Sequence, residues 1–205
     1  MNEDNCIIHN FEQGSENWFI KRLGKITASN VFTLRGNSKT RTSLIMEKAS
    51  EIITGVVPEQ IKSKDIDRGN ELEPKAREMY IFMTDNKVIE IGFAELDIYT
   101  GASPDGIVND GGLIEIKCPR AKSFLTQIVG GIESIDNMYI YQMQMQMYVL
   151  NKNWCDYVIY NEDFKNPIHI IRIERNEVII TEIKEVIERA IEDIKEIILI
   201  YKTRG

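Results

Sequence analysis

The residues with the clearest potential for chemistry are an aspartate, a glutamate and a lysine that lie close together in the sequence. Asp105 stands in a Ser-Pro-Asp-Gly segment, and Glu115 and Lys117 follow in a Glu-Ile-Lys-Cys-Pro segment. Carboxylate oxygens are the ligands that Mg²⁺ prefers, and a bound divalent ion can activate water and neutralise charge on a phosphate. A lysine next to them can orient that water or add positive charge. These residues therefore indicate metal-assisted hydrolysis of a phosphodiester.

The run Leu-Ile-Glu-Ile-Lys that ends at Lys117 reads as a β-strand, because apolar and charged residues alternate in it. Successive side chains of a strand point to opposite faces, so Glu115 and Lys117 share one face and the isoleucines occupy the other. A two-residue turn before this strand would pair Asp105 with Ile116 and direct its side chain to the wrong face. A three-residue loop with a glycine bulge would place Asp105 opposite Glu115 or Lys117 instead. Gly112 makes such a loop easy, and we expect an irregular turn.

This pattern is short, and on its own it also fits ordinary charged residues on a solvated hairpin. Further motifs surround it, at residues 13–18, 22–29, 68–74, 130–133 and 141–148. In this order, and with the two segments above between them, they resemble the phage lambda exonuclease (YqaJ-type) family of recombination nucleases. That family belongs to the P-D…(D/E)-x-K nuclease group. The resemblance extends over residues 11–148 and more loosely through the C-terminal helix.

The resemblance implies an α/β fold in which helices flank a mixed central β-sheet, as in restriction endonucleases, with the acids along one edge. It implies that residues 1–205 form a single YqaJ-type exonuclease domain. The implied activity is Mg²⁺-dependent 5′-to-3′ degradation of double-stranded DNA ends. The products would be 5′-mononucleotides and a 3′ single-stranded tail for recombination by strand annealing. Two Mg²⁺ ions are expected, with Mn²⁺ able to replace them.

The same resemblance implies partners and a setting. The chain is expected to form a ring-shaped homotrimer, to bind double-stranded DNA ends and to act with a single-strand annealing protein. A phage or prophage would encode it, and it would act in the cytoplasm of the bacterial host.

By resemblance, the catalytic and metal-binding residues can also be assigned. They are Asp105, Glu115, Ile116 through its backbone carbonyl, Glu73 and the catalytic lysine Lys117. Glu73 matches the family's upstream acid on a predicted helix. Glu71 lies two residues away, which on a helix directs it elsewhere, so it is not assigned to the site.

A pocket for a terminal 5′-phosphate is implied as well. Its residues by resemblance are Arg22, Ser29, Ser103 and Gln142. Arginine suits this role because its planar fork can bond phosphate oxygens in pairs. Ile66 lies where the family places an apolar wedge between the separating strands. Gln142 and Gln146 share a helix face, but only Gln142 matches the phosphate-contact position.

The composition agrees with a compact enzyme, since 43% of the 205 residues are apolar and 28% are charged. No apolar run approaches the roughly 18 residues of a membrane span, and the polar N-terminus is not a signal peptide. The three cysteines are odd in number and widely spaced, so they suggest neither a disulfide framework nor a C-x-x-C zinc site. The net charge of −7 is unfavourable for DNA binding.

The distribution of charge weakens that objection. Seven basic residues lie within 20–48 against one acid, whereas residues 174–196 hold eight acids and four bases. The basic segment fits either a solvated helix face or the inner surface of an enzyme that encircles DNA. We expect this segment to face the DNA.

The hydrophobic pattern predicts helices over 16–23, 42–54, 66–83, 139–150 and 177–201. Strands are predicted over 87–94, 98–102, 106–108, 113–117, 155–161 and 168–174. Ser29 is expected to cap the helix that follows it, and residues 33–42 to form a polar, basic loop. An apolar stripe on the last helix, from Ile183 to Tyr201, is expected to pack in the core.

Two other functions stay open at this point. One is a structure- or site-dependent DNA endonuclease of the same group, which would also cut closed circles. The other is a non-catalytic DNA-end-binding module, which the presence of all four catalytic side chains disfavours.

Overall fold

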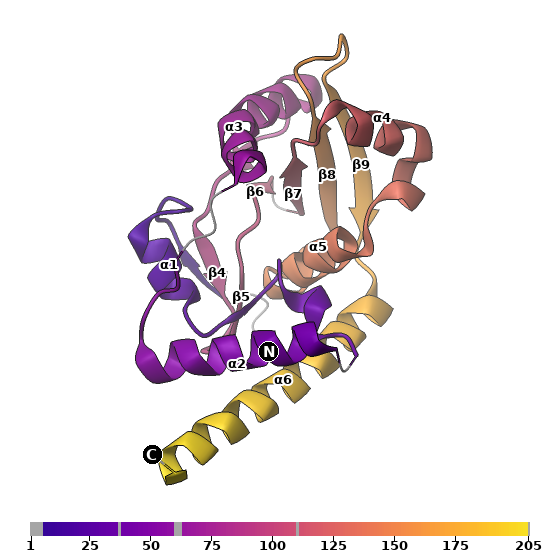
Figure 1. The fold of residues 1–205 in the computed structure, drawn as a ribbon. Coiled ribbons are helices and arrows are strands. Elements are labelled where there is room, and N and C mark those ends of the chain that lie inside the picture. The colour runs from indigo at the N-terminus through magenta and orange to yellow at the C-terminus, as the bar shows by residue number, and fades with distance from the viewer. Residues whose placement is uncertain (1–5, 37, 60–62, 110, 205) are drawn as a thin grey trace.

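The computed structural model describes residues 6–36, 38–59, 63–109 and 111–204, and it shows helices packed around two β-sheets (Figure 1). The helices are α1 (Glu16–Arg22), α2 (Lys39–Thr54), α3 (Lys64–Thr84), α4 (Ala121–Gly130), α5 (Asn137–Val149) and α6 (Glu177–Arg204), with short 3-10 helices η1 (Val31–Leu34) and η2 (Gly131–Ser134). The strands are β1 (Ile7–His9), β2 (Ile26–Thr27), β3 (Val88–Ile89), β4 (Phe93–Glu95), β5 (Thr100–Ala102), β6 (Gly106–Val108), β7 (Gly112–Lys117), β8 (Trp154–Tyr160) and β9 (Ile168–Glu174).

Both sheets mix parallel and antiparallel pairs. The five-stranded sheet has the order β3-β6-β7-β8-β9, in which β7 and β8 run parallel and the other neighbours antiparallel. The four-stranded sheet has the order β1-β4-β5-β2, in which β2 and β5 run parallel. The predicted mixed α/β fold is confirmed, with its strands divided between two sheets.

Helices cover both faces of the five-stranded sheet. On one face, Leu72, Ala76 and Tyr80 of α3 form a small core with Ile114 and Ile116 of β7. On the other face α5 packs against β7 and β8, and α6 packs against α5 and α2 (Figure 1). Strand β7, which carries the predicted catalytic residues, therefore lies between two helices, and burial on both sides holds it firmly in place.

Most predicted elements are present. The strands expected over 106–108 and 168–174 occur with these bounds, and most of the other helices and strands shift by one or two residues. Helix α3 continues through Pro74 without ending there. On α6, Ile183, Ile187 and Ile194 are buried as expected, but Tyr201 is exposed because the end of the helix extends beyond the body (Figure 1).

Some local predictions were wrong. Ser29 does not cap a helix: η1 begins at Val31 after Asn30. Part of the expected loop over 33–42 is helical, because Ser38 accepts a hydrogen bond from the backbone of Arg41 and starts α2 earlier. The strand expected over 87–94 is split between β3 in one sheet and β4 in the other. Helix α4 and strands β1 and β2 were not predicted.

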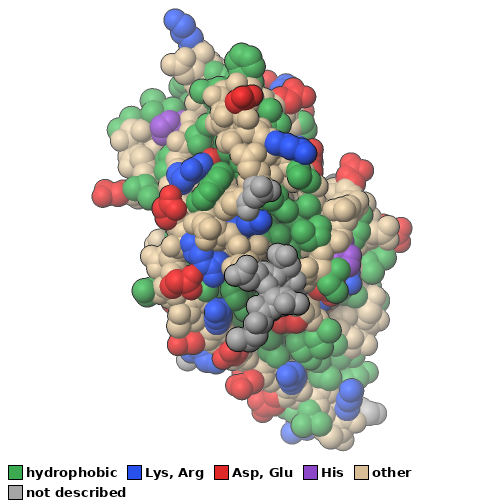
Figure 2. Space-filling model, turned by 180° about the vertical axis from the view of Figure 1, so that it is seen from behind, with side chains coloured by type: hydrophobic (Ala, Val, Ile, Leu, Met, Phe, Trp, Pro, Cys, Tyr) green, Lys and Arg blue, Asp and Glu red, His purple; other side chains and the backbone are tan. Residues whose placement is uncertain are grey.

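The basic segment 20–48 is largely neutralised by acids of the same chain. The pairs are Lys21 and Lys25 with Glu95, Arg35 with Glu182, Arg41 with Asp193, and Lys48 with Glu47 and Glu51. Two of these acids belong to α6, so the acidic helix and the basic segment compensate each other. Basic and acidic side chains are also interspersed on the face seen in Figure 2. The segment therefore presents far less free positive charge than its sequence implies.

Among the helices of the described residues, none combines the length and the apolar character that crossing a membrane requires.

Candidate active site

The hairpin of β6 and β7 brings Asp105 beside Glu115. Gly106 pairs with Ile114, so the antiparallel register places Asp105, one residue before β6, opposite Glu115. The backbone amide of Asp105 donates to the carbonyl of Ile114 at 3.2 Å, which extends the ladder by one residue. The loop between the two strands has three residues. The register expected from an odd-numbered loop is confirmed, and the two carboxylates lie side by side on the paired segments.

Glu115 is enclosed under α5, with 1% of the residue exposed. Its Oε1 accepts hydrogen bonds from Gln142 Nε2 at 2.6 Å and from Lys117 Nζ at 2.5 Å. Its Oε2 accepts one from Gln146 Nε2 at 2.7 Å. Glu115 and Lys117 share a strand face as predicted, but this face is covered by a helix. Hydrogen bonds to both oxygens fix the orientation of the Glu115 carboxylate.

Asp105 and Glu73 are linked through an arginine. Asp105 Oδ2 accepts from the backbone amide of Ile116 at 2.6 Å. One turn after Glu73 on α3, Arg77 donates to the Glu73 carboxylate, and its Nε donates to the backbone carbonyl of Asp105 at 3.2 Å. Arg77 thereby holds the upstream acid close to the strand that carries Asp105.

The electrostatics of the site indicate an excess of negative charge. Burial raises the pKa of Asp105 well above its ordinary value, and the carboxylates of Glu115 and Glu73 raise it further. Burial also raises the pKa of Glu73, against the effect of Arg77. Burial would lower the pKa of Lys117, but Glu115 and Asp105 outweigh it and raise that pKa. A cation placed among these carboxylates would relieve their repulsion.

Two cavities meet at these residues. The larger has a volume of about 700 Å³, and Glu73, Asp105, Ile116 and Lys117 all line it. The smaller has a volume of about 200 Å³, and Asp105 and Lys117 line it together with Glu115. Asp105 and Lys117 thus form a boundary that both cavities share.

The residues that the sequence assigns to a phosphate pocket also line the smaller cavity. Arg22, Ser29, Ser103 and Gln142 line it beside the catalytic residues. Residues far apart in the sequence are therefore brought together as predicted. Ile66, at the start of α3, lines the larger cavity and is about half exposed, at 47%.

Arg22 is a partly buried cation held by polar and aromatic groups. Its guanidinium carbon lies 4.0 Å from the centre of the Trp18 ring, and its nitrogens donate to Ser103 Oγ at 3.3 Å and to Thr27 Oγ1 at 3.4 Å. Among the described residues, no carboxylate forms an ion pair with it. Burial lowers the pKa of Arg22 to about 10, and the more distant charge of Glu51 opposes this. A partly buried guanidinium of this kind is ready to receive an anion.

Ser103 is already committed to neighbouring groups. Its hydroxyl donates to the carbonyl of Gly92 at 2.9 Å and accepts from Trp18 Nε1 at 3.0 Å as well as from Arg22. A serine hydroxyl has one hydrogen and two acceptor positions, so this network uses all of them. In this arrangement Ser103 orients Arg22, while Ser29 Oγ lies 3.2 Å from Thr27 Oγ1.

The oxygen donors suit a hard divalent cation. Within the part of the chain that the structure describes, no set of three or more His, Cys, Asp and Glu side chains is arranged to hold a metal ion by itself. Mg²⁺, however, is commonly bound by one or two carboxylates and keeps several waters. Asp105 and Glu115 provide those carboxylates. The Ile116 carbonyl is directed to the same side of β7 as its amide, toward Asp105. The residues present therefore fit Mg²⁺.

Sequence reasoning missed Arg77 and the contact that Gln146 makes. The spacing of four residues between Glu73 and Arg77 could have indicated an ion pair on one helix face. The shared face of Gln142 and Gln146 was recognised, but nothing in the sequence showed that both amides meet the same carboxylate.

Comparison with known proteins identifies the family of the chain. The model of the YqaJ-like viral recombinase domain matches residues 17–153. The chain belongs to this family. The crystal structure of an alkaline exonuclease from Laribacter hongkongensis is 36% identical, with a TM-score of 0.86, over 93% of this chain and 97% of the other. Its complex with dAMP is 36% identical over the same shares, with a TM-score of 0.87.

A further solved structure is similar to the chain in fold alone. A phage-related exonuclease from Haemophilus somnus 129PT is 21% identical, with a TM-score of 0.68, over 85% of this chain and 95% of the other. No curated protein sequence matches the chain significantly.

Proposed function

We propose that this protein is a Mg²⁺-dependent exonuclease that degrades double-stranded DNA ends in the 5′-to-3′ direction. It releases 5′-mononucleotides and leaves a 3′ single-stranded tail for recombination by strand annealing. The observation that carries the proposal is the 200 Å³ cavity in which Arg22 lies beside Asp105, Glu115 and Lys117. A cation that can receive a terminal phosphate thereby adjoins the carboxylates that can hold a metal.

Each residue has a role in this proposal. Asp105, Glu115 and the Ile116 carbonyl hold Mg²⁺, of which two ions are expected, with Glu73 as a further acid beside them. When bound, Mg²⁺ neutralises charge on the scissile phosphate and lowers the pKa of water, and Mn²⁺ can do the same. Lys117 donates hydrogen bonds to the attacking water and keeps it in line with the phosphorus.

The other residues read the end of the DNA. Arg22 pairs with the terminal 5′-phosphate, whose charge exceeds that of an internal diester. Ser103 and Trp18 hold the guanidinium in place, Ser29 offers a hydroxyl at the pocket, and Gln142 supplies an amide for a phosphate oxygen. Ile66, on the rim of the larger cavity, acts as the apolar wedge that separates the strands.

We also propose a cyclic homotrimer and a single-strand annealing protein as its partner. The chain carries a net charge of −7, and much of the basic segment is paired internally. A single copy would hold DNA weakly through charge alone. A closed ring retains the duplex topologically between turnovers, which removes the need for a large basic surface.

The test compares linear duplex DNA with covalently closed circles of the same sequence, in Mg²⁺ and in chelator. The proposal predicts mononucleotides from the linear duplex in Mg²⁺, intact circles, and no product in chelator. Cleavage of the circles would establish the endonuclease alternative, and binding of ends without any product would establish the non-catalytic alternative.

A further inference from the structure

Gln146 is a fully buried side chain that binds one oxygen of Glu115, while Lys117 and Gln142 bind the other. It is 0% exposed, and its Nε2 donates to Glu115 Oε2 at 2.7 Å. Gln142 lines the smaller cavity, whereas Gln146 is absent from the described residues that line either cavity at the site. Substrate in these cavities can therefore meet Gln142 but not Gln146.

The hydrogen bonds to Glu115 leave one acceptor position open. Each carboxylate oxygen offers about two. Among the described residues, Oε1 receives two donors, from Lys117 and Gln142, and Oε2 receives one, from Gln146. The remaining position lies on Oε2, the oxygen that Gln146 holds. The hydrogen bond from Gln146 sets the direction of this open position.

Packing alone does not account for an amide at residue 146. Its Oε1 has no hydrogen-bond partner among the described residues, and an orphaned buried oxygen is unfavourable. Met143, Met145 and Met147 on the same helix are all fully buried. A methionine at 146 would occupy a similar volume without an orphaned oxygen. The favourable contribution of Gln146 must therefore lie in its bond to the Glu115 carboxylate.

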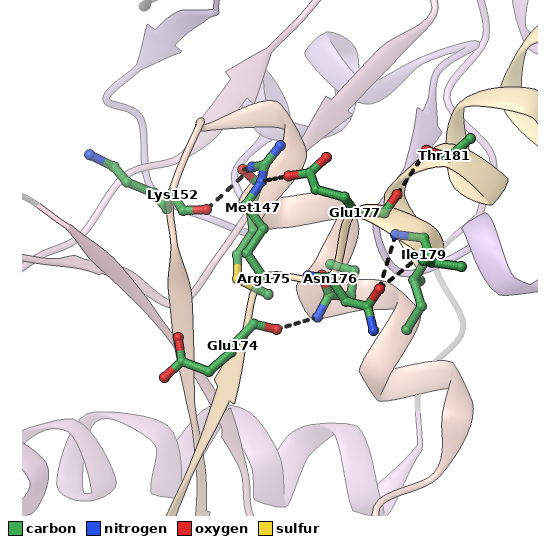
Figure 3. A network of polar contacts seen from close by, with 10 residues as sticks. Met147, Lys152, Glu174, Arg175, Asn176, Glu177, Ile179 and Thr181 are labelled. Atoms are coloured by element: carbon green, nitrogen blue, oxygen red, sulfur yellow. Dashed lines mark hydrogen bonds and ion pairs between the residues drawn. The ribbon is translucent and has the colours of Figure 1, made fainter.

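Gln144 provides a contrast two residues away on the same helix. It is also buried, but its Nε2 donates to the carbonyl of Glu174 at 2.8 Å and its Oε1 accepts from the amide of Asn176 at 2.8 Å. These bonds belong to the junction of β9 and α6, where Arg175 also bonds the carbonyl of Met147 (Figure 3). Gln144 thus anchors the fold at a distance from the carboxylates.

We propose that Gln146 is a positioning residue, which holds Glu115 Oε2 in the orientation that binds the metal ion. This inference rests on the proposed function. Hydrogen-bond partners of metal ligands typically contribute 10- to 100-fold to metal affinity or activity. A side chain of the same shape without the amide should therefore weaken the metal site and leave the fold intact.

The experiment compares the wild type with Gln146→Met and with the matched control Gln144→Met. Three quantities are measured: Mn²⁺ affinity of the metal-free protein by calorimetry, turnover on linear duplex in saturating Mg²⁺, and the melting temperature. Gln146→Met should lose about 10- to 100-fold in Mn²⁺ affinity or turnover. Its melting temperature should change little, because removal of the orphaned Oε1 offsets the lost bond to Glu115. Gln144→Met should melt roughly 5 °C lower, because it leaves two backbone groups unpaired, with Mn²⁺ affinity and turnover unchanged.

The outcomes separate this inference from the proposed function. A wild type without nuclease activity would refute the proposed function, and the Mn²⁺ affinities would still test the role of Gln146. Unchanged metal affinity and turnover in Gln146→Met would overturn the inference, as would identical changes in the two variants. If Gln146→Met and the smaller Gln146→Leu both fail to fold, Gln146 is a structural residue and the inference is equally wrong.

Discussion

Removal of Arg22 should abolish the ability of the enzyme to recognise a terminal phosphate. Its guanidinium is stacked on Trp18 and bonded to Ser103 and Thr27, and all of these partners are uncharged. In Arg22→Ala the cavity beside Asp105 and Glu115 remains, but its cation is gone. The mutant should therefore lose most of its preference for 5′-phosphorylated over 5′-hydroxyl ends.

The size of the effect follows from the charge environment. Burial lowers the pKa of Arg22 from 12.5 to about 10. At about 1.4 kcal/mol per pH unit, this corresponds to about 3 kcal/mol of electrostatic cost that a bound phosphate can offset. Loss of one partner from a desolvated charge pair typically costs about 2–5 kcal/mol. The rate on phosphorylated ends should fall by about 30-fold to several thousand-fold, with little change on hydroxyl ends.

The assay measures initial rates of wild type and mutant on duplexes that differ only in the 5′ group. Arg35→Ala is the matched control, because Arg35 also lies over an aromatic ring, that of Tyr141, but pairs with Glu182. It should keep the wild-type ratio of the two rates. If Arg22→Ala also kept that ratio, Arg22 would be an ordinary structural arginine and the pocket for the end would lie elsewhere.

Three further predictions concern the catalytic strand, acid stability and assembly. Glu115→Gln and Lys117→Ala should each abolish hydrolysis in the nuclease assay. Glu115→Gln should keep the fold, because the Gln146 amide can turn its oxygen toward the new Nε2 and keep one hydrogen bond between the two side chains. More than a few per cent of wild-type activity in either variant would exclude that residue. Burial of Glu95 would raise its pKa, but hydrogen bonds from Lys21, Lys25 and His9 outweigh the effect of burial and lower this pKa to about 2. The ionised Glu95 therefore stabilises the fold fully above its ordinary pKa of 4.5, and this stabilisation disappears as the pH falls toward 2. In chemical denaturation, the difference in unfolding free energy between wild type and Glu95→Gln should close over that range, and a difference that widens there would contradict the assignment. Light scattering should report a trimer at micromolar concentration, and a monomer would refute the ring.

The register of the catalytic hairpin could be predicted because strands have a strict period of two. A loop with an even number of residues would have turned the Asp105 side chain away from Glu115, and only a loop with an odd number of residues agreed with a functional site. The residues that line the smaller cavity could be grouped because they lie in motifs whose order resembles that of a known family. The register follows from local sequence, whereas the grouping follows from the resemblance.

Other features depend on contacts between distant segments. Lys25 and Lys48 are buried against Glu95 and Glu51, and no local pattern in the basic segment reveals such partners. The strand over 87–94 is divided between two sheets, since β3 pairs with β6 and β4 pairs with β1 and β5. Between them Gly92 lies against the backbone of residue 11: an added Cβ would lie 2.2 Å from the Phe11 carbonyl oxygen.

The short elements escaped prediction for a related reason. Strands β1 and β2 have three and two residues, too few for a periodic pattern. In α4, apolar residues do recur at helical spacing, at 124, 125, 128 and 129, but Phe124 alone is buried among the described residues of that helix. This helix could have been predicted from its periodicity and was missed.

The central claim is that this site removes nucleotides from the 5′ end of a duplex. The most direct measurement uses a 5′-phosphorylated linear duplex with distinct labels in the 5′-terminal and 3′-terminal nucleotides of one strand, in Mg²⁺, sampled before the duplex is consumed. The account predicts that the 5′ label appears first, as a 5′-mononucleotide, while the 3′ label stays in the polymer. Early release of the 3′ label, or release of either label as an oligonucleotide, would contradict it.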